Sequence, residues 1–218
     1  MDAPIDLISD PQPSMARRRF LKVFAGGTLG AALSYTVLAD AEGWVAEKTY
    51  EATGRPIGNA SEAEKLGATC GGQTEDKAIA QCYLDQIDTG SYFAFTSVVA
   101  PISEEITFRG LTSKIVDRGL PDKEVGRNIV LGTDHLGFSR RELIAGAVSS
   151  VLFGFAHNIT NSGLNTRTLP TPQIICGAYF WGIARKFGLP ASMAAHGMLN
   201  LGNTRRSVAY LKNYIQQR

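Results

Sequence analysis

The chain has 218 residues, a formal net charge of +2 and 44% hydrophobic residues. This length suffices for one substantial core and is short for two, and the near-neutral charge gives no sign of a nucleic-acid partner. The mean hydropathy of −0.04 is low for a protein with many membrane helices, so a soluble helical protein has to be weighed against a membrane protein.

The first 41 residues resemble a targeting segment. Residues 1–14 contain several prolines and are expected to be a disordered leader. In residues 15–41, the basic run Arg17-Arg18-Arg19 precedes a weakly apolar, glycine-containing stretch that ends in Ala39-Asp40-Ala41. This order fits either a twin-arginine export signal, cleaved after Ala41, or a retained first membrane helix with its basic end in the cytoplasm.

Residues 42–90 form a polar segment in which no active-site pattern is visible, and we assign it no role. It contains two of the three cysteines, Cys70 and Cys82. These two could form a disulfide in an oxidising compartment, or they could be unrelated. Cys176 stands in an apolar stretch and is expected to be a free, packed thiol.

The remainder predicts helices separated by loops rich in glycine and proline. Ser139 is a candidate N-cap, Gly188 a helix end, and Pro190 the first turn of a new helix. Gly146, Ser150 and Gly154 recur every four residues, which lets helices approach closely. The expected helices are 104–116, 140–157, 173–187 and 191–203, joined by loops 119–139 and 158–172 and followed by a tail, 204–218.

A first group of polar residues follows an apolar segment. Glu105 and Arg109 are four apart, lie on one helical face and can pair, which leaves Glu104 as a free carboxylate. A carboxylate in an apolar cavity can act as a general base or acid. Alternatively, both glutamates could complement a helix N-terminus.

Two histidines stand in the later apolar helices. His157 shares a helical face with Phe153, and His196 shares one with Asn200. His157 could equally be a satisfied helix-end residue, and His196 with Asn200 a buried hydrogen-bond network or a pair of oxyanion donors. The third histidine, His135, lies in a polar loop and is expected at the surface.

Taken together, the three groups resemble the motifs EExxxR, FxxxH and HxxxN of the CPBP family. This family includes CAAX prenyl endopeptidases of the Rce1 type and bacteriocin-processing and immunity (Abi) proteins. The motifs stand here as Glu104-Glu105-Ile106-Thr107-Phe108-Arg109, Phe153-Gly154-Phe155-Ala156-His157 and His196-Gly197-Met198-Leu199-Asn200. The resemblance covers residues 91–203, which we take as the catalytic core.

The resemblance implies an all-α, membrane-embedded bundle with about four core helices. It also implies an intramembrane endopeptidase in which Glu104 and His157 activate water, His196 and Asn200 form the oxyanion site, and Glu105 with Arg109 supports the first motif helix. The expected partners are a peptide or membrane-attached protein substrate and membrane lipid. We expect a multi-pass protein of the cell membrane, in bacteria the inner membrane.

Three alternatives remain open. No HExxH motif is present, so we expect no cofactor, although two histidines and a glutamate also form a set that zinc accepts. A non-catalytic immunity or partner-binding protein on the same scaffold is a second alternative, and a soluble exported protein with a metal site is a third. The basic residues of 107–141 predict a cytoplasmic loop, whereas Arg205, Arg206 and Lys212 do not fit simple alternation of sides.

Overall fold

A computed structural model describes residues 15–54, 69–70, 76–119, 129–131, 137–161 and 163–216. The predicted leader, His135 and most of the predicted loop 119–139 lie outside these residues. Helices make up nearly all of the described chain, so the prediction of an all-helical protein is confirmed. The strands are two short antiparallel pairs, β1 (Ile129–Leu131) with β2 (Phe138–Ser139) and β3 (Ile159–Thr160) with β4 (Gly163–Leu164).

The N-terminal segment forms helices that pack against the rest of the chain. α1 (Met15–Leu33) continues through the π-helical turn η1 (Ser34–Leu38) into α2 (Ala39–Thr53). The glycines of α1 allow a close approach, because a Cβ on Gly26 would lie 2.1 Å from Phe187 and one on Gly30 would lie 2.8 Å from Ile183. Tyr179 also donates a hydrogen bond to the carbonyl of Gly30 (3.0 Å). These contacts join α1 to α9 (Thr171–Phe187).

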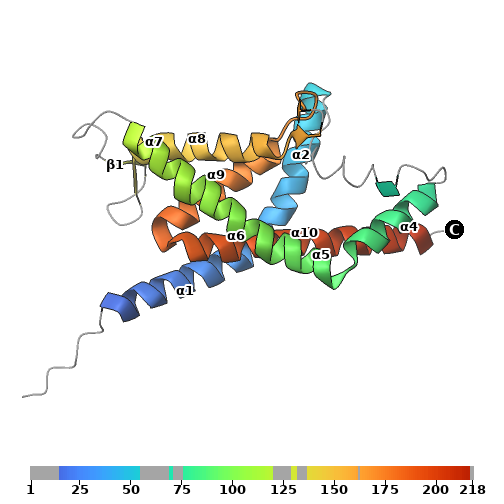
Figure 1. Cartoon of the computed structure of the whole chain (residues 1–218), viewed down its shortest axis with the longest axis horizontal. Coiled ribbons are helices and arrows are strands. Elements are labelled where there is room, and N and C mark those ends of the chain that lie inside the picture. Colours follow the sequence, from blue (N-terminus) through green and yellow to red (C-terminus); the bar gives the residue numbers. More distant parts are fainter. Residues whose placement is uncertain are drawn as a thin grey trace, which may run out of the picture.

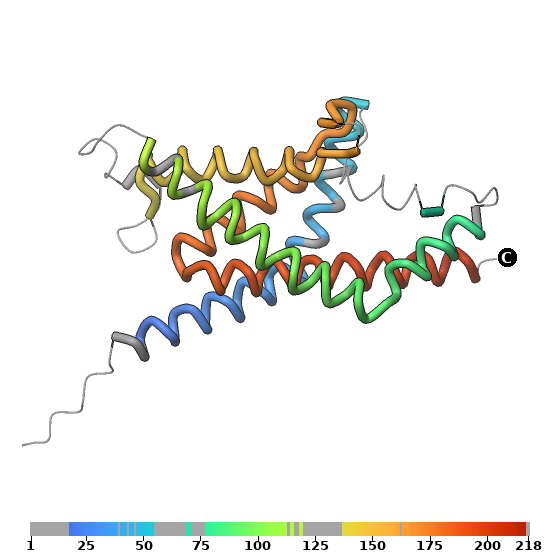
Figure 2. The backbone as a smooth tube through the Cα atoms, in the orientation of Figure 1, coloured from blue at the N-terminus to red at the C-terminus, as the bar shows by residue number. Residues whose placement is uncertain are grey.

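The segment that carries the first motif is a long helical rod with π-helical turns, seen in green in Figure 2. Its parts are α5 (Gly90–Ala94), η2 (Phe95–Val99), α6 (Ala100–Glu105), η3 (Ile106–Thr112) and α7 (Ser113–Gly119). The rod begins 14 residues before the predicted helix 104–116. π-Helical turns are often found at functional sites, and here one contains Arg109.

Two helices form the apolar layer beside the rod. α8 (Arg140–Ala156) begins at Ser139, whose side chain forms the predicted cap as part of a capping box with Glu142. α9 (Thr171–Phe187) lies against α8. A Cβ on Gly146 would be 2.6 Å from Trp181, and one on Gly154 would be 2.3 Å from Ile174. The regularly spaced small residues therefore serve this close helix contact.

The last helix is longer than predicted. Gly188, at φ +100°, ends α9, and α10 (Leu189–Gln216) runs on for 28 residues. Residues 204–218 were predicted to be a tail after the helix. This prediction is wrong for residues 204–216, because they continue α10. Val208, Leu211 and Ile215 are spaced at helical intervals and pack against α4 (Asp76–Ile87). This apolar stripe stabilises the extension.

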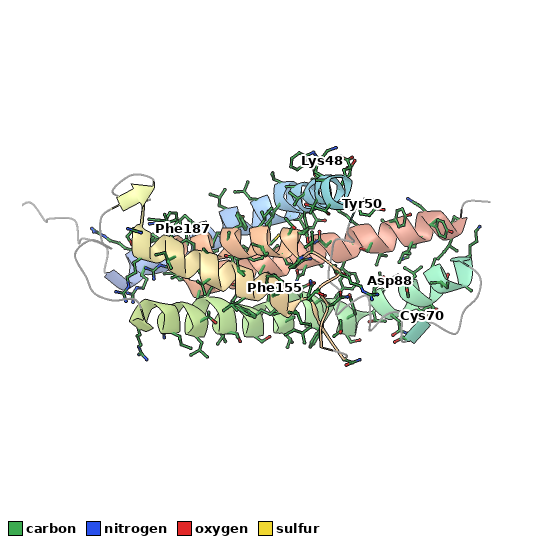
Figure 3. The ribbon with its side chains drawn as sticks, turned by 90° about the horizontal axis from the view of Figure 1, so that it is seen from above. Lys48, Tyr50, Cys70, Asp88, Phe155 and Phe187 are labelled. Atoms are coloured by element: carbon green, nitrogen blue, oxygen red, sulfur yellow. A yellow bond between two sulfur atoms is a disulfide. The ribbon has the colours of Figure 1, made fainter. Side chains whose placement is uncertain are left out.

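A disulfide and an ion pair link the segments at the end of the molecule where α4 packs against α10. Cys70 and Cys82 form a disulfide, and Lys212 of α10 lies 2.6 Å from Asp88, just after α4. Figure 3 labels Cys70 and Asp88 toward one end of the molecule and Phe187 toward the other. The sequence allowed Cys70 and Cys82 to be either joined or unrelated, and the structure shows that they are joined. Cys176 is free and buried, as predicted.

Among the described residues, one helical segment, Arg18–Leu38, is long and apolar enough to cross a membrane, judged by length and composition alone. α8 and α9 have 17 residues each. At a rise of about 1.5 Å per residue, each is slightly shorter than a hydrocarbon core of about 30 Å.

Candidate active site

The three motifs meet at one cavity of about 990 Å³. The rod supplies Glu104, Glu105 and Arg109, the C-terminal end of α8 supplies His157, and α10 supplies His196 and Asn200. Four of these line the cavity, namely Glu104, His157, His196 and Asn200. Glu105 and Arg109 lie behind its wall, with 0% and 6% of their surfaces exposed.

Glu105 is the centre of the buried hydrogen-bond network. Its Oε1 accepts a hydrogen bond from Nδ1 of His196 (3.0 Å), and its Oε2 accepts one from the hydroxyl of Ser192 (2.5 Å). Its Oε2 also lies 3.5 Å from Nε of Arg109, so the ion pair expected from the four-residue spacing is present. A buried carboxylate needs such partners because losing water around an unpaired charge is costly.

Arg109 is held by three kinds of contact. Besides Glu105, its Nη2 donates to the carbonyl of Gly177 in α9 (3.0 Å), and its guanidinium lies 4.2 Å from the ring centre of Phe153. Within the described part of the chain, its Nε and Nη1 have no hydrogen-bond partner. The side chain therefore ties the first motif to both α8 and α9.

His196 lies between the two glutamates. Its Nδ1 donates a hydrogen bond to Glu105. The other ring nitrogen, Nε2, faces Glu104 and lies 3.6 Å from its Oε2. The imidazole is stacked on Phe180, with ring centres 4.4 Å apart. Glu105 thus fixes the orientation of the imidazole and stabilises it when it is protonated, as an acidic partner does in other catalytic pairs.

His157 is oriented in the same way by a different acceptor. Its Nδ1 lies 2.8 Å from the carbonyl oxygen of Phe153, which can only accept, so Nδ1 carries a proton. Its Nε2 then faces Glu104, 3.9 Å from Oε2. Both imidazoles therefore direct Nε2 toward the same carboxylate, and the ring of Phe153 packs against both.

Asn200 lies one turn after His196. One N–H of its amide donates to the carbonyl of Thr96 in η2 (2.8 Å). An amide has two N–H donors, so the second is available to the cavity that Asn200 lines. A close contact makes this geometry feasible, since a Cβ on Gly197 would lie 2.3 Å from the carbonyl oxygen of Ser97.

Sequence reasoning missed two features of this site. It treated Glu105 as a partner of Arg109 alone, although its shortest contacts are to Ser192 and His196 on α10. It also assigned no role to residues 42–90, although Glu42 lines the cavity and accepts a hydrogen bond from Asn203. No short-range spacing pattern in the sequence indicates these three contacts, because the partners are 87 to 161 residues apart.

Glu104, His157 and His196 are of the side-chain types that bind zinc. Among the described residues, no group of three or more His, Cys, Asp or Glu side chains is arranged to hold a metal ion. The nearest approach to such a set is Glu104 with the two Nε2 atoms, at 3.6 and 3.9 Å. Nδ1 hydrogen bonds to a carboxylate and a carbonyl are also common around metal-bound histidines.

The fold brings a carboxylate and two imidazoles together in one cavity of a helical protein. The family model of the type II CAAX prenyl endopeptidase Rce1-like proteins matches residues 88–202, more than half of the chain. The chain belongs to this family, which is a family of membrane-embedded proteases. No curated protein and no solved structure matches the chain.

Proposed function

We propose that this protein is an intramembrane endopeptidase that hydrolyses a peptide bond with a water activated by Glu104 and His157. The observation that carries the proposal is the convergence of two Nε2 atoms on Oε2 of Glu104, at 3.6 and 3.9 Å. A carboxylate beside a neutral imidazole can take a proton from water as a general base.

The remaining residues complete the reaction. The water oxygen bonds to the carbonyl carbon of the substrate while its proton passes to the Glu104–His157 pair. The resulting oxyanion receives a hydrogen bond from the second N–H of Asn200, and a second one from Nε2–H of His196 when the ring carries a proton on both nitrogens. When the C–N bond breaks, the stored proton passes to the leaving amine. Glu105 holds the charge and orientation of His196 throughout, and Arg109 holds Glu105.

The test is hydrolysis of a peptide library, with and without lipid attached, by the purified full-length protein in detergent. We expect cleavage at an internal peptide bond, absent from the Glu104→Gln variant. A folded wild-type protein that binds library peptides but cleaves none would support the non-catalytic alternative, in which the scaffold serves an immunity or partner-binding role.

We expect a chelator to leave activity largely intact. The carboxylate and the imidazoles suffice to polarise water, and the distances from Glu104 to the two Nε2 atoms match direct or water-mediated contact between them. Activity is measured after dialysis against chelator and again after zinc is added. Activity that is lost on dialysis and restored by zinc would assign the centre to metal-assisted hydrolysis.

We further propose that the protein crosses the membrane several times, although Arg18–Leu38 is the only segment among the described residues that is long and apolar enough by itself. Large apolar side chains are exposed along the outer faces of α1, the rod and α8: Phe20, Phe24, Leu29, Val98, Val99, Ile106, Leu111, Val151, Leu152 and Phe155. Apolar surface on this scale is unusual in a soluble monomer and fits lipid contact.

The charges suggest an orientation. The start of α1, α7, the start of α8 and the end of α9 gather at one end of the molecule (Figure 1), and they carry the basic residues Arg18, Arg19, Lys22, Lys114, Arg118, Arg140, Arg141, Arg185 and Lys186. Such an end faces the cytoplasm. The disulfide lies toward the opposite end, which fits an oxidising compartment. In this orientation Arg205, Arg206 and Lys212 belong to the exported end.

Cysteine labelling tests this orientation. In a background without the native cysteines, Tyr50→Cys on α2 and Ile115→Cys on α7 both offer exposed positions. We expect a membrane-impermeant maleimide to label residue 50 in intact cells, and residue 115 only after the membrane is opened. Labelling of residue 115 before residue 50 would reverse the orientation, and equal labelling of both in a carbonate-soluble fraction would indicate a soluble protein.

A further inference from the structure

The N-terminal segment contributes a second carboxylate to the lining of the cavity, beside that of Glu104. Glu42, on α2, lines the same cavity as Glu104 and His196. Its Oε2 accepts a hydrogen bond from Nδ2 of Asn203 on α10, at 2.7 Å. Glu42 lies outside residues 88–202, the part of the chain that the family model matches.

Glu42 has no cationic partner to match its charge. Within the residues that the structure describes, no lysine or arginine side chain forms an ion pair with it. The neighbouring acid Asp40, by contrast, pairs with Arg206 (3.1 Å). Burial raises the pKa of Glu42, while the hydrogen bond from Asn203 and the nearby His157 lower it. A cation that enters the cavity beside a partly buried carboxylate of this kind stabilises its charged form.

A second acceptor lines the same cavity. Gln173, near the start of α9, has a buried Oε1 without a hydrogen-bond partner in the described part of the chain. Glu42 also lies near the adjoining part of α9, because it lines a small neighbouring cavity together with Pro172 and Cys176. A buried acceptor without a donor is costly, so Gln173 too would be stabilised by a donor from a ligand.

An apolar part of the cavity wall suits an aliphatic stem. Tyr92, Phe95, Phe108 and Leu199 supply aromatic and apolar surface between the polar groups. Such a surface packs against the methylene groups of a long basic side chain while its charged end reaches an acceptor. Glu42 offers acceptors only, and Gln173 offers its buried Oε1 as an acceptor beside its amide N–H donors, so the negative charge of Glu42 favours a cation over an anion.

We propose that Glu42, assisted by Gln173, forms a subsite that binds an ammonium or guanidinium group of the substrate next to the hydrolytic centre. This specificity rests on the proposed peptidase function, because it names the substrate chemistry that the same cavity accepts. The peptide would carry a lysine or arginine side chain, or a free N-terminus, within a few residues of the bond that is cleaved.

Peptide binding to the Glu104→Gln protein tests the subsite without consuming the peptide. The probes are fluorescent octapeptides of alanine and leucine in which one lysine is moved along the chain. Each is matched by a norleucine peptide, which keeps the stem without the charge, and each is made with a free and with an acetylated N-terminus. The protein is the full-length chain in lipid nanodiscs.

At one lysine position, or with the free N-terminus, we expect the cationic peptide to bind about tenfold or more tightly than its neutral match, the usual worth of a charge-assisted hydrogen bond. Glu42→Gln should reduce the ratio to about one, and Glu42→Asp should retain part of it. Gln173→Glu should raise the ratio, which keeps a test available if Glu42→Gln does not fold. Glu47→Gln, an exposed glutamate on the same helix, should leave the ratio unchanged.

Equal binding of charged and neutral peptides at every position, or a preference that survives Glu42→Gln, would overturn the subsite. Cleavage of the same peptides by protein with Glu104 intact separates the two proposals. Cleavage without a cation preference leaves the peptidase function standing and removes the subsite. A Glu42-dependent preference in binding without any cleavage keeps the subsite and removes the peptidase function.

Discussion

Replacing Glu104 with glutamine is expected to lower kcat/KM by roughly 10²–10⁴, the usual contribution of general acid–base catalysis. Glutamine keeps the size and most of the hydrogen bonding of glutamate but cannot accept a proton from water. Oε2 of Glu104 lies 3.6 Å from Nε2 of His196 and 3.9 Å from Nε2 of His157, so the substitution removes the group on which both imidazoles converge.

The fold should survive this substitution. The side chain of Glu104 is 28% exposed and faces the cavity, whereas that of Glu105 is 0% exposed. We therefore expect a melting temperature close to that of the wild type. Glu51→Gln, which breaks an exposed pair with Lys48, provides the control and should change neither rate nor stability measurably. A folded Glu104→Gln protein with wild-type turnover would mean that another group is the base.

Replacing Glu105 with glutamine is expected to destabilise the protein by about 3–5 kcal/mol, the range found when one partner of a buried ion pair is removed. The change leaves the guanidinium of Arg109 buried with the carbonyl of Gly177 and the face of Phe153 as its remaining neighbours. It also removes the anionic acceptor of Nδ1 of His196. Activity should fall by more than the unfolded fraction explains.

A double-mutant cycle separates the two effects. Arg109→Gln should cost less stability than Glu105→Gln, because Glu105 keeps the hydrogen bonds from Ser192 and His196. The double variant should be more stable than the sum of the single changes predicts. Denaturation in detergent gives the stabilities, and rates at a temperature where all four proteins are folded give the effect on catalysis.

Two results would contradict this assignment. Additive losses in the cycle would mean that Glu105 and Arg109 do not act as a pair. A folded, inactive Glu105→Gln protein beside an active Glu104→Gln protein would exchange the roles of the two glutamates. The ion pair at 3.5 Å and the His196 contact at 3.0 Å both involve Glu105, so stability and activity are expected to change together.

Local signals in the sequence were sufficient for much of the fold. Ser139 marked the start of α8, and Gly188 marked the end of α9, because caps depend on residues within one turn. The same reasoning ended the last helix too early. Polarity after Asn203 was taken as a tail, although Val208, Leu211 and Ile215 had the spacing of an apolar helical face.

The sequence by itself determined the helical class, the three motif segments and the pairing of Glu105 with Arg109, since a spacing of four fixes which side chains share a helical face. Only the tertiary structure decided that Glu105 also holds His196 and that Glu42 reaches the cavity, because these contacts join side chains 91 and 161 residues apart in the chain. It likewise decided that Cys70 and Cys82 are joined. Such contacts depend on how whole helices pack, and helix packing is set by many side chains at once rather than by any local pattern.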